Sequence, residues 1–176
     1  MPHRLHPALM VSALAGSLVL AGCSQDAQFA PVCPQLALLA DGADLTRFTG
    51  NGRDVTDRVL EARVLGVEAS CKPGRRGEVV ATLKVQSEFT RGPAAPGRVA
   101  VVPYFVAVLA GGDVVDRKEF ILEGNFATNV DQIRVAGSEV ELRFPVTAER
   151  SAAYYKIYVS LLLTPEELAF NRRPTR

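Results

Sequence analysis

The sequence predicts an all-β protein, an antiparallel β-sandwich with a short C-terminal helix. Apolar and polar residues alternate with period two in several segments after Leu36, which is typical of strands with one buried face. Glycine- and proline-rich turns separate these segments at intervals of about 10 to 20 residues, and helical periodicity is nearly absent. A chain of about six or seven such strands favours two sheets packed face to face.

The clearest predicted strand is EVVATLKVQSEFT, residues 78–90, which is apolar on one face and polar on the other. The apolar face comprises Val79, Ala81, Leu83, Val85 and Phe89. A long strand over residues 59–71 precedes it, and Lys72-Pro73-Gly74 forms the turn between the two, because Pro and Gly resist continuation of a strand.

The segment RVAVVPYFVAVLA, residues 98–110, is apolar on both faces and is therefore expected in the middle of a sheet. Pro103 lacks an N–H group, which predicts a bulge or an edge at that position. Gly111-Gly112 predicts a tight hairpin, because two-residue turns need positive φ angles. A strand over residues 113–122 follows, and then a looser section over residues 123–138.

Two further half-buried strands are predicted at residues 139–146 and 154–163. The stretch FPVTAERSAAYYKIYVSL, residues 144–161, resembles the tyrosine-corner region of immunoglobulin-like and fibronectin type III domains. That resemblance implies an immunoglobulin-like sandwich with Tyr154 or Tyr155 at the corner, and the phase of the strand favours Tyr155. The chain departs from the pattern because a helix replaces the next strand.

The C-terminal helix is predicted from Thr164-Pro165-Glu166-Glu167, which has a hydroxyl cap, proline at the first helical position and glutamate at the third. We expect the helix to end near Asn171. A basic tail, residues 172–176, is expected to be disordered.

Residues 1–22 have the pattern of a secretory signal peptide, which is helical and is removed in the mature protein. Arg4 lies in the basic start, an apolar run follows to Leu20, and Ala21-Gly22 is a small pair. The apolar run is shorter than the roughly 18 to 20 residues that a membrane-spanning helix needs. No membrane span is therefore expected in the mature chain.

Leu20-Ala21-Gly22-Cys23 resembles the lipobox of bacterial lipoproteins. The resemblance implies a diacylglycerol on the Cys23 sulfur, cleavage before Cys23, and often a third acyl chain on its amine; the alternative is an ordinary signal peptide with a cysteine near its cleavage site. Two or three acyl chains hold a domain stably to a bilayer. Residues 23–32 then form a flexible tether to a domain over residues 33–171.

The same resemblance implies a protein of the cell envelope that faces the periplasm. Ser24 and Gln25, rather than an acidic residue, follow Cys23, which favours the outer membrane over the inner one. The general pattern is similar to that of Gram-negative envelope lipoproteins for which no activity is assigned.

Cys33 and Cys71 are the two other cysteines, and thiols oxidise outside the cytoplasm. We expect one disulfide between them, which ties the lead-in to the first long strand; free or reactive thiols are the alternative. Without residues 1–22 the formal net charge of +1 falls to about zero, which gives no electrostatic support for nucleic acid as a partner.

Catalysis is not expected, and no cofactor is predicted. The two histidines, His3 and His6, belong to the signal peptide, so the mature chain has no imidazole for acid–base work. A pair of carboxylates of the glycosidase type is the remaining route to an enzyme, and it depends on their separation in space.

Aspartates crowd into residues 41–57 and are weak candidates for a calcium site, although their spacing does not match the twelve-residue calcium loop. Capping of their own turns is the alternative. The candidates are Asp41, Asp44, Asp54 and Asp57.

Three tyrosines, Tyr104, Tyr154 and Tyr158, are expected opposite the core-facing residues of their strands, where amphipathic aromatics mark a docking surface. A second sheet packed on them is the alternative. The sequence as a whole predicts a lipid-anchored, non-catalytic interaction or assembly module whose partner is another envelope protein. Binding of calcium, a glycan or a small ligand by the loops of residues 41–57 is the rival hypothesis.

Overall fold

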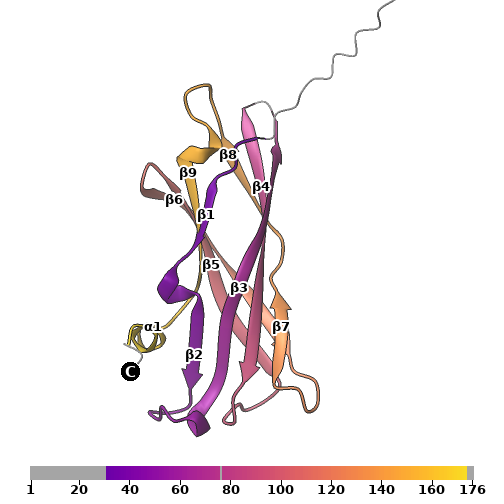
Figure 1. Cartoon of the computed structure of the whole chain (residues 1–176), viewed down its shortest axis with the longest axis vertical. Helices are drawn as coiled ribbons and strands as arrows, with labels where there is room; N and C mark the ends of the chain where they lie inside the picture. Colours follow the sequence, from indigo (N-terminus) through magenta and orange to yellow (C-terminus); the bar gives the residue numbers. More distant parts are fainter. Residues whose placement is uncertain (1–30, 76, 174–176) are drawn as a thin grey trace, which may run out of the picture.

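The structure, a computed structural model, describes residues 31–75 and 77–173. They form a β-sandwich of two elongated sheets with one short helix, α1, at its side (Figure 1). The predicted all-β sandwich with a C-terminal helix is therefore confirmed. The predicted signal peptide, Cys23 and most of the predicted tether lie outside the described residues.

The first sheet consists of four strands. In spatial order they are β1 (Gln35–Leu38), β9 (Tyr155–Leu161), β5 (Val99–Ala110) and β6 (Asp113–Asn125). β1 and β9 run parallel, with Leu36 beside Ile157, whereas β9, β5 and β6 are antiparallel. The predicted antiparallel sandwich therefore needs one correction: the first sheet is mixed, because its edge strand β1 runs in the same direction as β9.

The second sheet consists of five strands. Their order is β2 (Asp44–Phe48), β3 (Arg58–Pro73), β4 (Glu78–Arg91) and β7 (Gln132–Ala136), with β8 (Val140–Pro145) on β4 as well. β3 follows almost the whole length of β4, so β7 and β8 share the other side of β4, one after the other. Three 3-10 turns lie in the connections: Ala40–Gly42, Val55–Asp57 and Ala152–Tyr154.

The core lies between the sheets and is built from the alternate apolar residues of each strand. The predicted inward face of β4 is buried throughout, from Val79 to Phe89, and Lys84 on the other face is exposed. β8 alternates strictly between buried and exposed residues. Each strand therefore contributes its apolar face to one shared core.

Two hairpins form at the predicted glycine and proline turns. Gly111 and Gly112, with φ angles of 62° and 108°, connect β5 to β6. β3 ends at Pro73, and the Gly74 N–H group donates a hydrogen bond to the Glu78 carbonyl at 3.0 Å. β5 lies between β9 and β6, as its two apolar faces predict.

One detail of the predicted strands was wrong, and at Pro103 one of the two predicted alternatives is present. The looser section contains a strand, β7, because Val135 takes part in the core although its neighbours are polar and exposed. The register of β5 and β6 is unbroken at Pro103, and the irregularity lies at Val108/Leu109. The predicted bulge is therefore absent at Pro103, but the predicted edge is present, because β5 pairs with β9 only from Tyr104 onwards.

Three further predicted features are present: the disulfide, the tyrosine corner and the helix cap. Cys33 and Cys71 form a disulfide, with their Cα atoms 5.9 Å apart. The Tyr155 hydroxyl donates to the Pro145 carbonyl at 3.0 Å, which ties the start of β9 to the end of β8. α1 (Pro165–Asn171) begins with the predicted capping box, in which the Glu167 N–H donates to the Thr164 hydroxyl at 3.2 Å. No helix in the described part of the chain is long and apolar enough to cross a membrane.

Candidate functional site

Tyr104 is not a surface residue, so its predicted role in docking was wrong. Its side chain is 0 % exposed and stacks on Phe120 at 5.4 Å between ring centroids. Both faces of β5 are apolar, so alternation alone could not show which face points inward. Inside the core, the Tyr104 hydroxyl has no hydrogen-bond partner among the described residues, and burial raises the pKa of this group.

Substitution of Tyr104 with phenylalanine is expected to raise the free energy of unfolding by about 1 kcal/mol, because it removes a buried hydroxyl without a partner. The raised pKa of Tyr104 also makes the free energy of unfolding depend on pH. The unfolded chain releases this proton near the ordinary value of 10.0 while the folded chain retains it, so the wild-type protein should lose stability above that pH.

Urea unfolding at neutral pH and above pH 10.0 measures both effects. The Tyr104→Phe variant should lose less stability between the two pH values than the wild type. A destabilised variant at neutral pH would mean that the hydroxyl has a partner.

The other two predicted tyrosines are accessible to different degrees. Tyr154 is 44 % exposed, and the Arg150 guanidinium lies 4.8 Å from its ring centroid. Tyr158 is half-buried on the outer face of the first sheet, beside Ala37 and Ala107. No strand of the described residues packs on that face at Tyr158. Because Tyr104 is in the core, however, the three tyrosines do not form the one docking surface that was predicted.

The candidate aspartates fall into two separate pairs. Asp41 and Asp44 form ion pairs with Arg172 and Arg63, at 2.7 and 2.6 Å. Asp54 and Asp57 cap the turn at the other end of the β2–β3 hairpin, where the Asp54 N–H donates to the Asp57 carboxylate at 3.1 Å. Within residues 31–75 and 77–173, no group of three or more potential ligand residues could hold a metal ion.

Arg172 was predicted to lie in a disordered tail, but it contacts the domain through its ion pair with Asp41. The neighbouring guanidinium of Arg173 lies 5.6 Å from the Phe170 ring centroid. The helix α1 and the first residues after it are thus held against the turn before β2. Residues 174–176 lie outside the described part of the chain.

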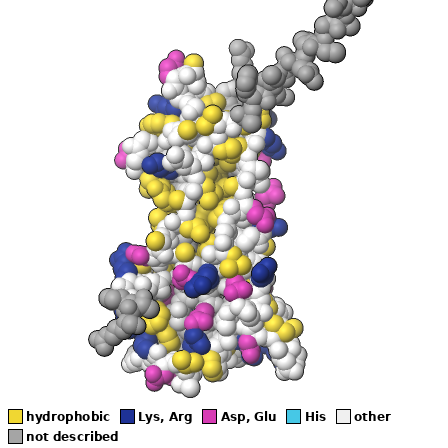
Figure 2. All heavy atoms as spheres, in the orientation of Figure 1, with side chains coloured by type: hydrophobic (Ala, Val, Ile, Leu, Met, Phe, Trp, Pro, Cys, Tyr) yellow, Lys and Arg dark blue, Asp and Glu magenta, His cyan; other side chains and the backbone are white. Residues whose placement is uncertain are grey.

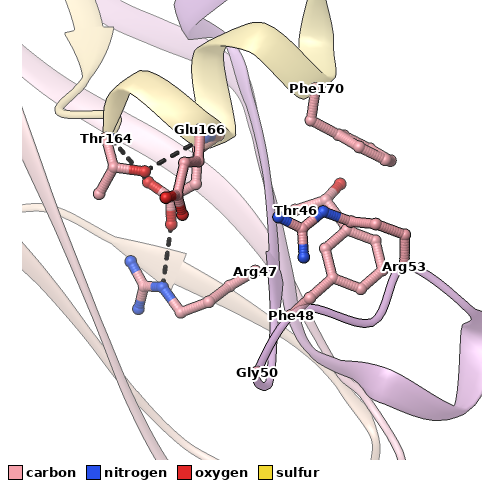
Figure 3. A pocket seen from close by; sticks show the side chains of 9 residues that line it. Thr46, Arg47, Phe48, Gly50, Arg53, Thr164, Glu166 and Phe170 are labelled. Carbon is pink, nitrogen blue, oxygen red and sulfur yellow. Dashed lines mark hydrogen bonds and ion pairs between the residues drawn. The ribbon is translucent and has the colours of Figure 1, made fainter.

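A small polar pocket of about 210 Å³ lies between α1 and β2 (Figure 3). Glu167 is 7 % exposed, accepts from the Thr164 N–H at 2.8 Å and pairs with the Arg47 Nε atom at 3.0 Å. Arg53 on the opposite wall stacks on Phe48. The charged groups of this pocket therefore hold α1 on β2. This structural role is sufficient to explain why a nearly buried glutamate and an arginine are present there.

A larger groove, which we call the β6–β8 groove, opens between the edges of the two sheets. Its volume is about 560 Å³. At one end of the edge, β6 packs closely on β7, since a Cβ atom added at Gly124 would lie 2.8 Å from Ile133. At the other end β6 and β8 line the two walls of the groove.

The floor of the β6–β8 groove is apolar and its rim is charged. Phe144 and Tyr155, with ring centroids 5.1 Å apart, line it together with Val108 and Leu142. Val115 on the rim is 58 % exposed. Surface of this kind, apolar with a polar rim, is typical of a recognition site.

The rim charges are mostly paired with one another. Arg143 contacts Glu141 at 2.6 Å, and Lys118 contacts Asp116 at 3.5 Å. Arg150 makes no ion pair with the described residues and stacks on Tyr154. The Arg150 cation and the exposed Tyr154 ring are thus available beside the groove.

Sequence reasoning missed this groove because it depends on the divergence of two sheet edges that are distant in the sequence. The one signal was the predicted tyrosine corner, residues 144–161, of which Phe144, Pro145 and Tyr155 line the groove. Comparison of the chain with protein-family models, curated proteins and solved structures finds no match. The function is therefore argued from the sequence and this geometry.

Proposed function

We propose that this protein is a lipid-anchored envelope lipoprotein on the periplasmic side, at the outer membrane rather than the inner one, and that it acts as a non-catalytic interaction module. Its partner is another envelope protein, which binds in the β6–β8 groove. The observation that carries the proposal is the groove itself, a hollow between two strand edges with buried apolar side chains at its floor, the exposed Val115 on its rim and charged groups around it.

The anchor is supported by the lipobox-like Leu20-Ala21-Gly22-Cys23, and the compartment by the Cys33–Cys71 disulfide, since such bonds persist outside the cytoplasm. Nine residues lie between Cys23 and Cys33, so the ten peptide steps from one to the other span at most about 35 Å in any conformation. An acylated Cys23 therefore keeps the sandwich close to the bilayer and to its neighbours there.

A non-catalytic role is supported by the bonds that potentially reactive cysteine and carboxylate side chains already make within the fold. Cys33 and Cys71 are joined in the disulfide. The carboxylates of Asp41, Asp44 and Glu167 are engaged by arginines. These groups have structural partners, which is what supports a non-catalytic role.

Photo-crosslinking in intact envelopes tests the proposed surface. A photoreactive amino acid at Glu141 on the rim should give a specific adduct with one envelope protein, identified by mass spectrometry. The same amino acid at Val55, which is 65 % exposed but lies far from the groove, is the matched control.

Val115→Asp then distinguishes specific binding from proximity. A charge placed on this apolar rim should reduce the Glu141 adduct by about tenfold or more, since about 1.4 kcal/mol is a factor of ten. Val55→Asp should leave the adduct unchanged. Equal adducts from Val55 and Glu141, or insensitivity to Val115→Asp, would contradict binding in the groove.

A further inference from the structure

One half of β3 is an unpaired strand edge. β2 covers only the first part of β3, up to Arg63, and its pairing ends where the Val64 N–H donates to the Ala43 carbonyl at 2.8 Å. A bulge follows between Val64 and Gly66. From there to Pro73, β3 pairs with β4 alone among the described strands, and Figure 1 shows this half of β3 extending past the end of β2.

This edge is open on the inner side of the sheet as well. Ala69 lies opposite Leu83 and on the same face, yet Leu83 is 1 % exposed whereas Ala69 is exposed. Hydrophobic side chains gather on the surface where β1 and this half of β3 lie (Figure 2). The neighbouring Glu68, Ser70 and Lys72 are exposed too, so the edge is accessible along its length.

The backbone of this edge has a defined set of free groups. The Gly74 N–H bonds to Glu78 of β4, and in an antiparallel pair every second residue points its N–H and C=O groups at the same neighbour. Ser70 and Lys72 therefore point these groups at β4. Ala69 and Cys71 point theirs away from it, and Pro73, in the same position, has no N–H to leave unpaired.

We propose that two copies of this chain associate by antiparallel pairing of β3 with β3, about a two-fold axis at Ser70. In this register Ala69 exchanges both backbone hydrogen bonds with Cys71 of the second copy. Pro73 lies opposite Val67 of the second copy, where its carbonyl accepts from the Val67 N–H, and its missing N–H leaves one carbonyl, that of Val67, unpaired at each end of the ladder. The small side chains of Ala69 and Ser70 allow the backbones to approach closely.

Charge complementarity favours a second copy in this register over the two registers shifted to Glu68 or Lys72, and Glu68 is held at the surface by a hydrogen bond from Gln86 of its own sheet at 3.0 Å. Glu68 lies opposite Lys72 of the second copy, and Lys72 lies opposite Glu68 of the second copy. Both are non-hydrogen-bonded pairs, in which side chains come closest. An axis at Glu68 or at Lys72 would instead place like charges opposite each other, and cross-strand like charges are destabilising.

The pairing is compatible with the proposed membrane anchor, although it does not depend on it. Cys33 is bonded to Cys71, which lies next to the axis, so both tethers start near the centre of the dimer. Two copies anchored in one bilayer are also confined together, which raises their effective concentration. The β6–β8 groove lies at the opposite edge of the second sheet and stays free.

A charge swap tests the dimer in the mature chain, residues 23–176, carrying Cys23→Ser, which has neither acyl chains nor the apolar signal peptide. Sedimentation velocity over a series of concentrations should show a monomer–dimer equilibrium. Glu68→Lys and Lys72→Glu should each weaken dimerisation about tenfold, or about 1.4 kcal/mol, because each creates two like-charge pairs. The double variant Glu68→Lys/Lys72→Glu should restore it.

Glu123→Lys is the matched control, because it makes the same charge change at an exposed position of β6. Circular dichroism and thermal unfolding show whether each variant is folded. A wild-type chain that is monomeric at every concentration, or a double variant no better than the single ones, would overturn the proposal. Loss of lipidation or of the envelope partner would not affect this result, so the two proposals fail separately.

Discussion

Removal of the disulfide is expected to lower the free energy of unfolding by about 3 kcal/mol. Cys33 and Cys71 are 38 residues apart in the sequence, so the bond closes a long loop. Closing this loop lowers the conformational entropy of the unfolded chain. The bond also fixes the lead-in before β1, which among the described strands pairs with β9 alone, in a short parallel ladder. We expect β1 to detach first when the bond is absent.

The double variant Cys33→Ser/Cys71→Ser removes both partners of the bond, so neither is left as an unpaired thiol, and it is the cleaner measurement. Urea unfolding should give the same stability for this variant as for the wild-type protein in a reducing agent. The variant itself should not respond to the reducing agent. A wild-type protein whose stability is unchanged by reduction would show that the bond contributes nothing.

Substitution of Gly92 with alanine is expected to cost about 3 kcal/mol, at the upper end of the range for overpacking. A Cβ atom at this position would overlap the backbone carbonyl group of Arg58, which cannot rotate away as a side chain can. The loop after β4 would have to move. Such movement would break two hydrogen bonds, from the Gly92 N–H to Val59 at 2.9 Å and from the Ala94 N–H to Arg58 at 3.0 Å.

Gly97→Ala in the same loop is the matched control, because nothing lies within 4 Å of a Cβ atom added there. It should leave the stability unchanged or raise it by up to about 1 kcal/mol, through the lower entropy of the unfolded chain. Thermal unfolding of the two variants compares them directly. Equal stabilities would contradict the close contact between the loop and β3.

Most of the fold was predictable because its determinants are local in the sequence. The inward face of β4, the Gly111-Gly112 hairpin and the capping box of α1 each depend on residues within a few positions of one another. Tyr155 was predicted at the corner from its phase in the strand, and the structure places its hydroxyl on Pro145.

The errors arose where tertiary context decides the outcome. Tyr104 was assigned to the surface because both faces of β5 are apolar, and only the position of the second sheet selects the buried one. The parallel pairing of β1 with β9 joins segments from opposite ends of the chain. Local periodicity holds no information on either feature.

The candidate sites were less predictable than the fold. The aspartates of residues 41–57 looked like one cluster in the sequence, but the β2–β3 hairpin separates them into two pairs with their own partners. The β6–β8 groove and the free edge of β3 arise from the relative lengths and the divergence of strands. Such features are set by packing of distant segments.

The membrane anchor is tested most directly by the mass of the N-terminal peptide of the protein isolated from cell envelopes. We predict a peptide that begins at Cys23 and carries a diacylglycerol on sulfur, with or without an amide-linked acyl chain. An unmodified thiol at Cys23, or a protein that still carries residues 1–22, would contradict a lipid-anchored sandwich facing the periplasm.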